Sequence, residues 1–358
     1  MQGTAERADP IDPILSVENL RTTYYTDKEE IHAVDGVDFH VNRGETLGIV
    51  GESGSGKSVT ARSVLGLVDE PGVIEAGSSI TFDGEELTEK TEREMERIRG
   101  GRIAMVFQDP LNSLNPVYTV GNQIREALQL HRGISGSTAK EKAIELLEDV
   151  GIPDATRRVD EFPHQFSGGM RQRAVIAMGL ACDPDLLICD EPTTALDVTI
   201  QAQIIEYLEE IQARRGLSII FITHDMGVIA EVADRVAVMY AGKIAESAPV
   251  SELFANASHP YTEGLLASIP GNNVGRDRLA TIEGDVPTPT STATSCRFSP
   301  RCPKAFDDCR TVHPKLVPVR DGVTDHTAAC LLYPDDEPRT DAVETHRDHD
   351  TATEETER

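Results

Sequence analysis

The sequence has no tryptophan, and aromatic residues make up only 4% of its 358 residues. Proteins that bind single-stranded nucleic acid by stacking need aromatic side chains, so this scarcity argues against such a function. Positive charge is also scarce, because 34 Lys and Arg residues face 61 Asp and Glu residues and the formal net charge is −27. A surface this acidic repels phosphate backbones, which argues against a nucleic-acid-binding protein of the basic-patch type.

Lysine is scarcer than arginine, with eight Lys against 26 Arg. An acidic, lysine-poor surface suits a protein kept soluble in strong salt, because salt of about 1 M screens repulsion between like charges within ~3 Å. The composition therefore predicts a protein of a halophile, with an ordinary acidic cytosolic protein as the alternative.

Long apolar runs are absent from the sequence. A membrane-spanning helix needs about 18 apolar residues in a row, whereas the longest apolar runs here, such as 186–189 and 218–223, have the length of strands. The first residues, MQGTAERADPID, lack the basic start and apolar core of a signal peptide. We therefore expect a cytosolic protein, in which the six cysteines are ligands or core residues rather than disulfides.

Short strands and helices alternate along the first 250 residues, which predicts an α/β fold with a mostly parallel sheet. The run TLGIV at 46–50 is continuously apolar, as is typical of a central parallel strand buried on both faces. A helix is predicted over 58–67, mostly helical sequence over 113–182, and further strands over 186–191 and 218–223.

The two ends and the C-terminal part differ in composition from this core. Residues 1–13 are polar and are predicted to be disordered. Beyond residue 250, Pro and Thr become frequent, and four of the six cysteines fall within 35 positions. Residues 334–358 contain ten acidic residues and three arginines with almost nothing apolar, so this tail is also predicted to be disordered.

The segment GESGSGKS, from Gly51 to Ser58, fits the pattern G-x-x-x-x-G-K-S of a phosphate-binding loop, or P-loop. It follows the apolar strand and opens a predicted helix, which is the context that this motif requires. Glycines let the loop wind so that backbone N–H groups point at a phosphate chain, and the helix N-terminus adds partial positive charge. Lys57 is expected to bridge the β- and γ-phosphates, and the Ser58 hydroxyl to bind Mg²⁺.

The predicted strand LLICDE ends in two acidic residues, Asp190 and Glu191. Carboxylates at the carboxyl end of a strand face the ligand crevice of an open α/β sheet. Asp190 is expected to hold Mg²⁺ through water, and Glu191 to accept a proton from an attacking water. The two motifs predict a P-loop NTPase. A GTPase is excluded because the sequence lacks the Asn-Lys pair of a guanine-binding motif. An ATPase that assembles as a ring and uses an arginine finger is still an alternative at this point.

A second candidate anion cradle is formed by Ser167, Gly168 and Gly169 in FSGGMRQR, at the start of a predicted helix. One chain then carries two phosphate cradles on different surfaces. We therefore expect a head-to-tail dimer in which each cradle completes the partner's site.

With these motifs the chain resembles the nucleotide-binding subunit of ABC transporters, and FSGGM stands where the family has LSGGQ. The resemblance covers residues 14–330. It implies ATP and Mg²⁺ as ligands, a P-loop ABC ATPase core with a mixed sheet over 14–250, and a helical subdomain over 112–182. Met170 stands in place of the family's final Gln, but the backbone donors and Ser167 are kept, so we expect the site to hydrolyse ATP.

The resemblance also assigns roles to single residues. It implies that Gln108 contacts Mg²⁺ and senses the membrane partner, that His224 bonds the γ-phosphate, and that Tyr24, or its neighbour Tyr25, stacks on adenine. The implied catalytic residues are Glu191, His224, Gln108 and Lys57, and the implied Mg²⁺ ligands are Ser58, Gln108 and Asp190. The implied nucleotide-binding set is Tyr24, Gly51, Ser53, Gly54, Ser55, Gly56, Lys57, Ser58, Thr60, Gln108, Asp190, Ser167, Gly168, Gly169 and Asp197.

Softer motifs narrow the resemblance to a subgroup. FQDPLNSLNPVYTVG at 107–121 and SHPYT at 258–262 are similar to the ATPases of peptide and nickel importers. GMRQR resembles the D-type partner of a pair of unlike ATPases, and the salt-adapted composition described above suggests a haloarchaeal member. This implies a second ATPase subunit, two permeases and an extracellular solute-binding protein as partners, at the cytoplasmic side of the cell membrane. Import of di- or oligopeptides is the expected function. A nickel or other small-solute importer, or a soluble ABC protein without a permease, are the alternatives.

The four late cysteines, Cys296, Cys302, Cys309 and Cys330, lie in a Pro-rich extension over 251–333 that can bury little core. Thiolates favour iron–sulfur or zinc ligation, and Cys302 precedes a proline as some cluster ligands do. The alternatives for these four cysteines are a structural 4Fe–4S cluster, a structural Zn²⁺ site, and free thiols or disulfides. Cys182 and Cys189 are expected to be packing residues.

Overall fold

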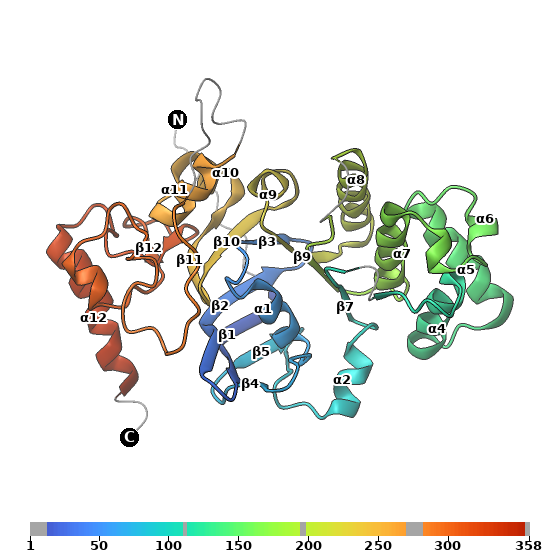
Figure 1. Cartoon of the computed structure of the whole chain (residues 1–358), viewed down its shortest axis with the longest axis horizontal. Coiled ribbons are helices and arrows are strands. Elements are labelled where there is room, and N and C mark those ends of the chain that lie inside the picture. The colour runs from blue at the N-terminus through green and yellow to red at the C-terminus, as the bar shows by residue number, and fades with distance from the viewer. Residues whose placement is uncertain (1–12, 110–112, 194–197, 270–281, 355–358) are drawn as a thin grey trace, which may run out of the picture.

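The computed structural model describes residues 13–109, 113–193, 198–269 and 282–354, arranged around two sheets (Figure 1). The first sheet is antiparallel, with the strand order β2-β1-β5-β6 and with β4 paired to β1. Its strands are β1 (Pro13–Tyr25), β2 (Glu30–Asn42), β4 (Gly72–Ile74), β5 (Ser79–Phe82) and β6 (Glu85–Glu86).

The second sheet has eight strands in the order β12-β13-β11-β10-β3-β9-β8-β7. Neighbours from β10 to β7 are parallel, whereas β11, β13 and β12 extend the sheet with antiparallel pairs. The strands are β3 (Thr46–Val50), β7 (Ile103–Val106), β8 (Leu186–Asp190), β9 (Ser218–Thr223), β10 (Arg235–Tyr240), β11 (Lys243–Pro249), β12 (Val317–Pro318) and β13 (Thr327–Ala328). The predicted α/β fold with a mixed sheet is confirmed.

Burial explains why the central strands read as apolar runs. Every residue of β3, β8 and β9 is buried, as expected for parallel strands covered on both faces. Helix α1 (Lys57–Val64) contacts β1, β2 and β8 and so lies between the two sheets, while α9 (Met226–Val232) contacts β3 and β9. The second sheet therefore forms the middle layer of the molecule.

The parallel strands β3, β7, β8 and β9 end at one edge of this layer. The P-loop follows β3, Gln108 follows β7, Asp190 closes β8, and His224 follows β9. Because the carboxyl ends of parallel strands share an edge, motifs that are far apart in the sequence meet there.

A group of helices extends beyond β7 and appears in green at the right of Figure 1. It consists of α4 (Val120–Arg132), α5 (Gly136–Asp149), α6 (Ala155–Arg158) and α7 (Gly168–Leu180), and α4, α5 and α7 contact one another. The Thr119 hydroxyl caps α4 by accepting from the Asn122 N–H, and Gly133 ends it at φ 66°. Ile124 and Leu128, one turn apart on α4, are fully buried in the core of the group.

Further helices of the described residues are α2 (Glu92–Ile98), α8 (Val198–Arg215), α10 (Val250–Asn256), α11 (Pro260–Ala267) and α12 (Arg339–Glu354), with short 3₁₀ turns at Pro163–Gln165 and Asp307–Arg310. No helix in the described part of the chain is long and apolar enough to cross a membrane.

The predicted disorder of the acidic tail is wrong for residues 339–354, which form α12. Ala342 and Val343 are buried, the latter beside Val312 and Leu331. The buried His346 ring accepts from the Lys315 N–H through Nδ1 at 3.1 Å and contacts the Tyr333 carbonyl through Nε2 at 3.2 Å. Burial of a few side chains therefore stabilises this helix despite the acidic composition on which the prediction of disorder was based. The predicted disorder of residues 1–12 lies outside the described residues.

Candidate functional site

The P-loop connects β3 to α1 and is closely packed at both ends. A Cβ at Gly51 would lie 2.1 Å from the Met239 carbonyl oxygen, and a Cβ at Gly56 would lie 2.4 Å from that of Ala33. Gly56 also has a φ of +104°, which disfavours other residues. Glycine is therefore required at both positions for the loop to adopt this path.

Lys57 points back into the loop that it ends. Its Nζ donates to the carbonyl oxygens of Gly51 at 2.7 Å and Glu52 at 3.0 Å, and the residue is only 5% exposed. Burial lowers the pKa of Lys57, while the carboxylates of Glu191, Asp190 and Glu52 act in the opposite direction. An ammonium group enclosed in this way is well placed to meet a phosphate chain.

Ser58 and Asp190 meet where α1 begins and β8 ends. The Ser58 hydroxyl donates to Asp190 Oδ1 at 2.9 Å, and Asp190 is 1% exposed. Burial raises the pKa of Asp190, and the hydrogen bond from Ser58 partly offsets this rise. Both groups are hard oxygen donors. Mg²⁺ prefers such donors and is commonly held by one or two carboxylates together with substrate phosphates, so the pair fits this ion.

Glu191 joins the ends of three neighbouring strands. Its Oε2 accepts from Gln108 Nε2 at 3.0 Å, and its Oε1 lies 3.2 Å from His224 Nδ1. Glu191 has a φ of 48°, in the left-handed region that a non-glycine residue rarely adopts. The contacts with Gln108 and His224 fix the position of the carboxylate between the ends of β7 and β9.

The other residues of the P-loop and the first turn of α1 differ in exposure and in their hydrogen bonds. Ser53 and Gly54 are exposed, whereas Ser55 is buried and its carbonyl accepts from the Gly242 N–H at 2.8 Å. The Thr60 hydroxyl donates to the Gly56 carbonyl at 3.1 Å. Thr60 therefore supports the loop from its own helix.

The two candidate adenine-stacking tyrosines are neighbours on β1 with different surroundings. Tyr24 is partly buried, its pKa is raised by burial, and it lies near Arg62 of α1, the helix that follows the P-loop. Tyr25 is 47% exposed and donates to Glu75 at 2.8 Å. Successive strand residues face opposite ways, so the surroundings favour Tyr24.

The second anion cradle, Ser167 to Gly169 in FSGGM, lies on a different element from the P-loop. Ser167 caps α7, and its Oγ accepts from the Met170 N–H at 3.3 Å. Ser167 and Gly168 are exposed, and a Cβ at Gly168 would meet nothing within 4 Å. Figure 1 places α7 in the helical group and α1 near the centre of the molecule. The chain does not bring this cradle to its own P-loop, and Asp197 lies outside the described residues.

Two residues of the C-terminal region contact the P-loop, and no sequence motif predicts these contacts. The backbone N–H of Glu52 donates to the Tyr261 hydroxyl at 2.9 Å, and Arg301 forms an ion pair with the Glu52 carboxylate at 2.8 Å. Tyr261 belongs to the SHPYT motif, but nothing in that motif indicates a partner in the P-loop.

The four late cysteines are free thiols. Within the described ranges, no group of three or more His, Cys, Asp or Glu side chains is placed to hold a metal ion. Two of them are close neighbours, because the Cys296 N–H donates to the Cys309 carbonyl at 3.0 Å and Cys296 packs against the small cluster that contains Cys309. Burial raises the pKa of Cys330 to about 12. Cys182 and Cys189 are buried in the main core.

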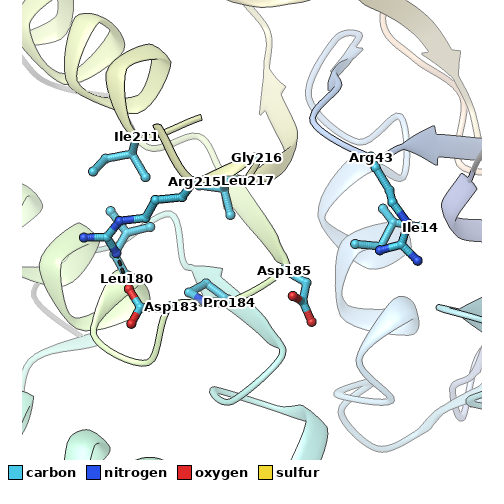
Figure 2. A pocket seen from close by; sticks show the side chains of 10 residues that line it. All are labelled: Ile14, Arg43, Leu180, Asp183, Pro184, Asp185, Ile211, Arg215, Gly216 and Leu217. Atoms are coloured by element: carbon cyan, nitrogen blue, oxygen red, sulfur yellow. Dashed lines mark hydrogen bonds and ion pairs between the residues drawn. The ribbon is translucent and has the colours of Figure 1, made fainter. Parts of the chain in front are cut away.

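Several hollows lie on the described part of the chain, and two of them adjoin the parallel strands. Figure 2 shows one at the opposite edge of the sheet, where Asp185 precedes β8 and Leu217 precedes β9, with an ion pair between Arg215 and Asp183. The other is a groove beside the site, lined by Arg62, Leu65, Arg99, Met105, Phe107, Gln108, Ala127, His131, Val175 and Met178. Since Gln108 lines this groove and also bonds Glu191, the groove adjoins the candidate catalytic residues directly.

Comparison with known proteins places these features in a family. Residues 34–194 match the sequence model of the ABC transporter family, and residues 245–309 match that of the oligopeptide/dipeptide transporter C-terminal region. The oligopeptide transport ATP-binding protein AppD of Bacillus subtilis is 50% identical over 320 residues, which are 89% of this chain and 97% of that protein. The chain belongs to the ABC transporter family.

Other ABC proteins are similar in sequence or in structure. A probable peptide ABC transporter ATP-binding protein, y4tR, of Sinorhizobium fredii is 51% identical over 320 residues, covering 89% of this chain and 95% of that protein. The dimeric ATP-binding cassette MJ0796, solved with ADP and Pi, superposes with a TM-score of 0.60 at 27% identity, covering 66% of this chain and 98% of that one. This ABC chain is accordingly an ATP-binding subunit of the oligopeptide/dipeptide transporter type and an ATPase.

Proposed function

We propose that this chain is the ATP-hydrolysing subunit of an ABC importer that takes up di- and oligopeptides. The convergence of Gln108, Glu191 and His224 beside the P-loop supports the hydrolytic part. Similarity to oligopeptide and peptide transport ATP-binding proteins at about half identity over most of the chain supports the cargo.

In this proposal the residues at the sheet edge share the work of hydrolysis. Lys57 and the loop N–H groups bind the β- and γ-phosphates, and Tyr24 stacks on adenine. Ser58 and Asp190 would hold Mg²⁺, which neutralises phosphate charge when it is bound. Glu191 orients a water in line with the γ-phosphorus and accepts its proton. His224, held by Glu191, donates a hydrogen bond to the γ-phosphate.

A second ATPase subunit completes each site. The exposed Ser167 and Gly168 supply a cradle that their own chain does not use, and Asp197 belongs to the segment that we expect to cross the dimer. The similar cassette MJ0796 is dimeric. The D-type motif GMRQR leads us to propose a sister ATPase rather than an identical copy as the partner.

The groove beside Gln108 is the proposed docking site for a permease at the cytoplasmic side of the membrane. Its lining combines apolar side chains, among them the 38%-exposed Phe107, with Arg62 and Arg99. A permease helix seated there would contact Gln108 and thereby act on Glu191. Two permeases and an extracellular solute-binding protein complete the proposed importer.

The test is reconstitution of this chain with its sister ATPase and permeases in vesicles, with the solute-binding protein outside. A labelled dipeptide should enter only with ATP and with all components present. Uptake of Ni²⁺ in place of peptide would identify the alternative importer. ATP hydrolysis that no permease changes would favour a soluble ABC protein.

We further propose that the four late cysteines form a structural metal site, either a 4Fe–4S cluster or Zn²⁺. Four soft thiol donors within 35 positions of the sequence support this. The described residues do not place these side chains as a ligand set. Absorbance near about 400 nm and metal analysis of anaerobically purified protein test it. Colourless, metal-free and fully active protein would reject both metals.

A further inference from the structure

Glu52, the second residue of the P-loop, is held through its N–H, its carbonyl and its side chain. The N–H donates to the Tyr261 hydroxyl at 2.9 Å, and the carbonyl oxygen accepts from Lys57 Nζ at 3.0 Å. The carboxylate receives two hydrogen bonds from Arg301, at 2.8 and 3.1 Å. Tyr261 and Arg301 lie 209 and 249 residues away in the sequence, in the C-terminal region.

The Arg301 side chain is held in place by contacts other than its ion pair with Glu52. Its side chain is only 7% exposed, and it also donates to the backbone carbonyls of Glu283 and Gly284, both at 2.8 Å. Its guanidinium lies 5.7 Å from the centre of the Tyr240 ring. A planar fork held in this way pairs with a carboxylate in one orientation only, which a lysine could not reproduce.

Tyr261 is equally fixed. It is fully buried, and its ring centre lies 4.7 Å from that of Tyr240 and 5.3 Å from that of Phe298. The Arg301 N–H in turn donates to the Phe298 carbonyl at 2.9 Å. Both contacts to Glu52 therefore come from one packed cluster, in which Arg301 and Tyr261 lie against the rings of Tyr240 and Phe298.

We propose that Tyr261 and Arg301 are positioning residues of the ATP site, through which the C-terminal region sets the conformation of the P-loop. A shift of Glu52 would displace the carbonyl that Lys57 contacts and turn the neighbouring N–H groups away from the phosphates. This inference rests on the proposed nucleotide site. If the two contacts only attached the C-terminal region to the core, their loss would lower stability without changing the use of ATP.

The test compares Arg301→Lys and Tyr261→Phe in the full chain, with Lys304→Gln as control. Lys304 lies in the same segment, and its ion pair with Glu263 is at the surface, with 46% and 39% of the two side chains exposed. We expect each of the two variants to raise the KM for ATP by about five- to tenfold, because Arg301→Lys misplaces hydrogen bonds between two charged groups and Tyr261→Phe leaves the Glu52 N–H without its neutral acceptor. We expect kcat to stay within about twofold, because Glu191 and His224 are untouched. Lys304→Gln should leave both constants unchanged.

A double variant shows whether Arg301 acts through Glu52. If it does, Glu52→Gln with Arg301→Gln should raise KM no more than the larger single change, because the two positions share one interaction. Should Arg301→Lys fail to fold, Tyr261→Phe, which keeps the packed ring, carries the test.

Lys57→Ala separates this inference from the nucleotide site itself. If it abolishes ATP binding while Arg301→Lys and Tyr261→Phe keep a wild-type KM, the positioning role is refuted and the site stands. If Lys57→Ala binds ATP normally, the site is wrong and the positioning role falls with it.

Discussion

The side-chain amide of Gln108 donates a hydrogen bond to the carboxylate of Glu191 at 3.0 Å, although 83 residues separate them in the sequence. Gln108 also lines the groove beside the helical group. A single side chain therefore connects the proposed permease surface to the proposed catalytic base. In the proposed importer, a permease seated in the groove would act on Glu191 through Gln108 rather than through the P-loop.

Replacing Glu191 by Gln should abolish turnover while ATP still binds. Glutamine keeps the size of the side chain but cannot accept the proton of the attacking water, and a general base typically contributes about 10²–10⁴-fold in rate. Single-turnover hydrolysis and equilibrium ATP binding measure the two effects separately. With ATP and the sister subunit, the variant should also accumulate as closed dimers in size-exclusion chromatography.

Glu210→Gln is the matched control, because Glu210 pairs with Arg214 on the surface of α8. It should hydrolyse ATP as the wild type does. Hydrolysis by Glu191→Gln within about threefold of wild type would show that Glu191 is not the base.

Replacing Gly51 by Ala should disrupt the P-loop. The new Cβ would lie 2.1 Å from the Met239 carbonyl oxygen, which belongs to β10 and cannot move without disturbing the sheet. We expect strongly weakened ATP binding and a lower Tm, measured by titration and by thermal unfolding. Gly179→Ala is the control, since its Cβ would lie no closer than 3.4 Å to the side-chain methyl groups of Leu187 and Val106, which is ordinary van der Waals contact. Equal behaviour of the two variants would contradict the geometry.

The P-loop and the strand-end carboxylates could be predicted from sequence because each is local. A strand, a glycine-rich turn and a helix follow one another within 46–64, and the rule that parallel strands share an edge brings Asp190 to Ser58. Neither step requires knowledge of the rest of the chain.

The contacts of Glu52 could not be predicted, because a pair separated by 249 residues leaves no local pattern. The tail helix α12 was missed for a related reason. Val343 and His346 look incidental in an acidic segment until Val312, Leu331 and Lys315 are placed around them. In both cases the contacting residues lie in the C-terminal region, whose conformation cannot be predicted from local sequence patterns.

Acid should destabilise the protein through His259. Burial lowers the pKa of His259 from 6.5 to about 4. Between about pH 6.5 and pH 4, His259 is therefore protonated in the unfolded chain but neutral in the folded chain. The free energy of unfolding consequently falls as the pH drops through this range. His313, whose pKa is also lowered to about 4 by burial, adds to the effect.

His259→Asn should make this pH dependence shallower. His259 caps α11 by accepting from the Tyr261 N–H at 3.0 Å, and an asparagine oxygen can accept the same bond without titrating. Denaturant unfolding at pH 7, 6 and 5 measures the slope. An unchanged slope in the variant would exclude His259 as a source of acid sensitivity.

Salt should stabilise the folded chain. The net charge of −27 on 358 residues, with eight Lys, causes repulsion between like charges. This repulsion destabilises the compact folded state more than the unfolded chain, in which the charges are farther apart. Raising KCl from about 0.1 M to 1 M shortens the screening length from ~10 Å to ~3 Å, which weakens this repulsion. We expect Tm and ATPase activity both to rise over this range. A Tm that does not change, or that falls, would argue for an ordinary acidic protein rather than one adapted to strong salt.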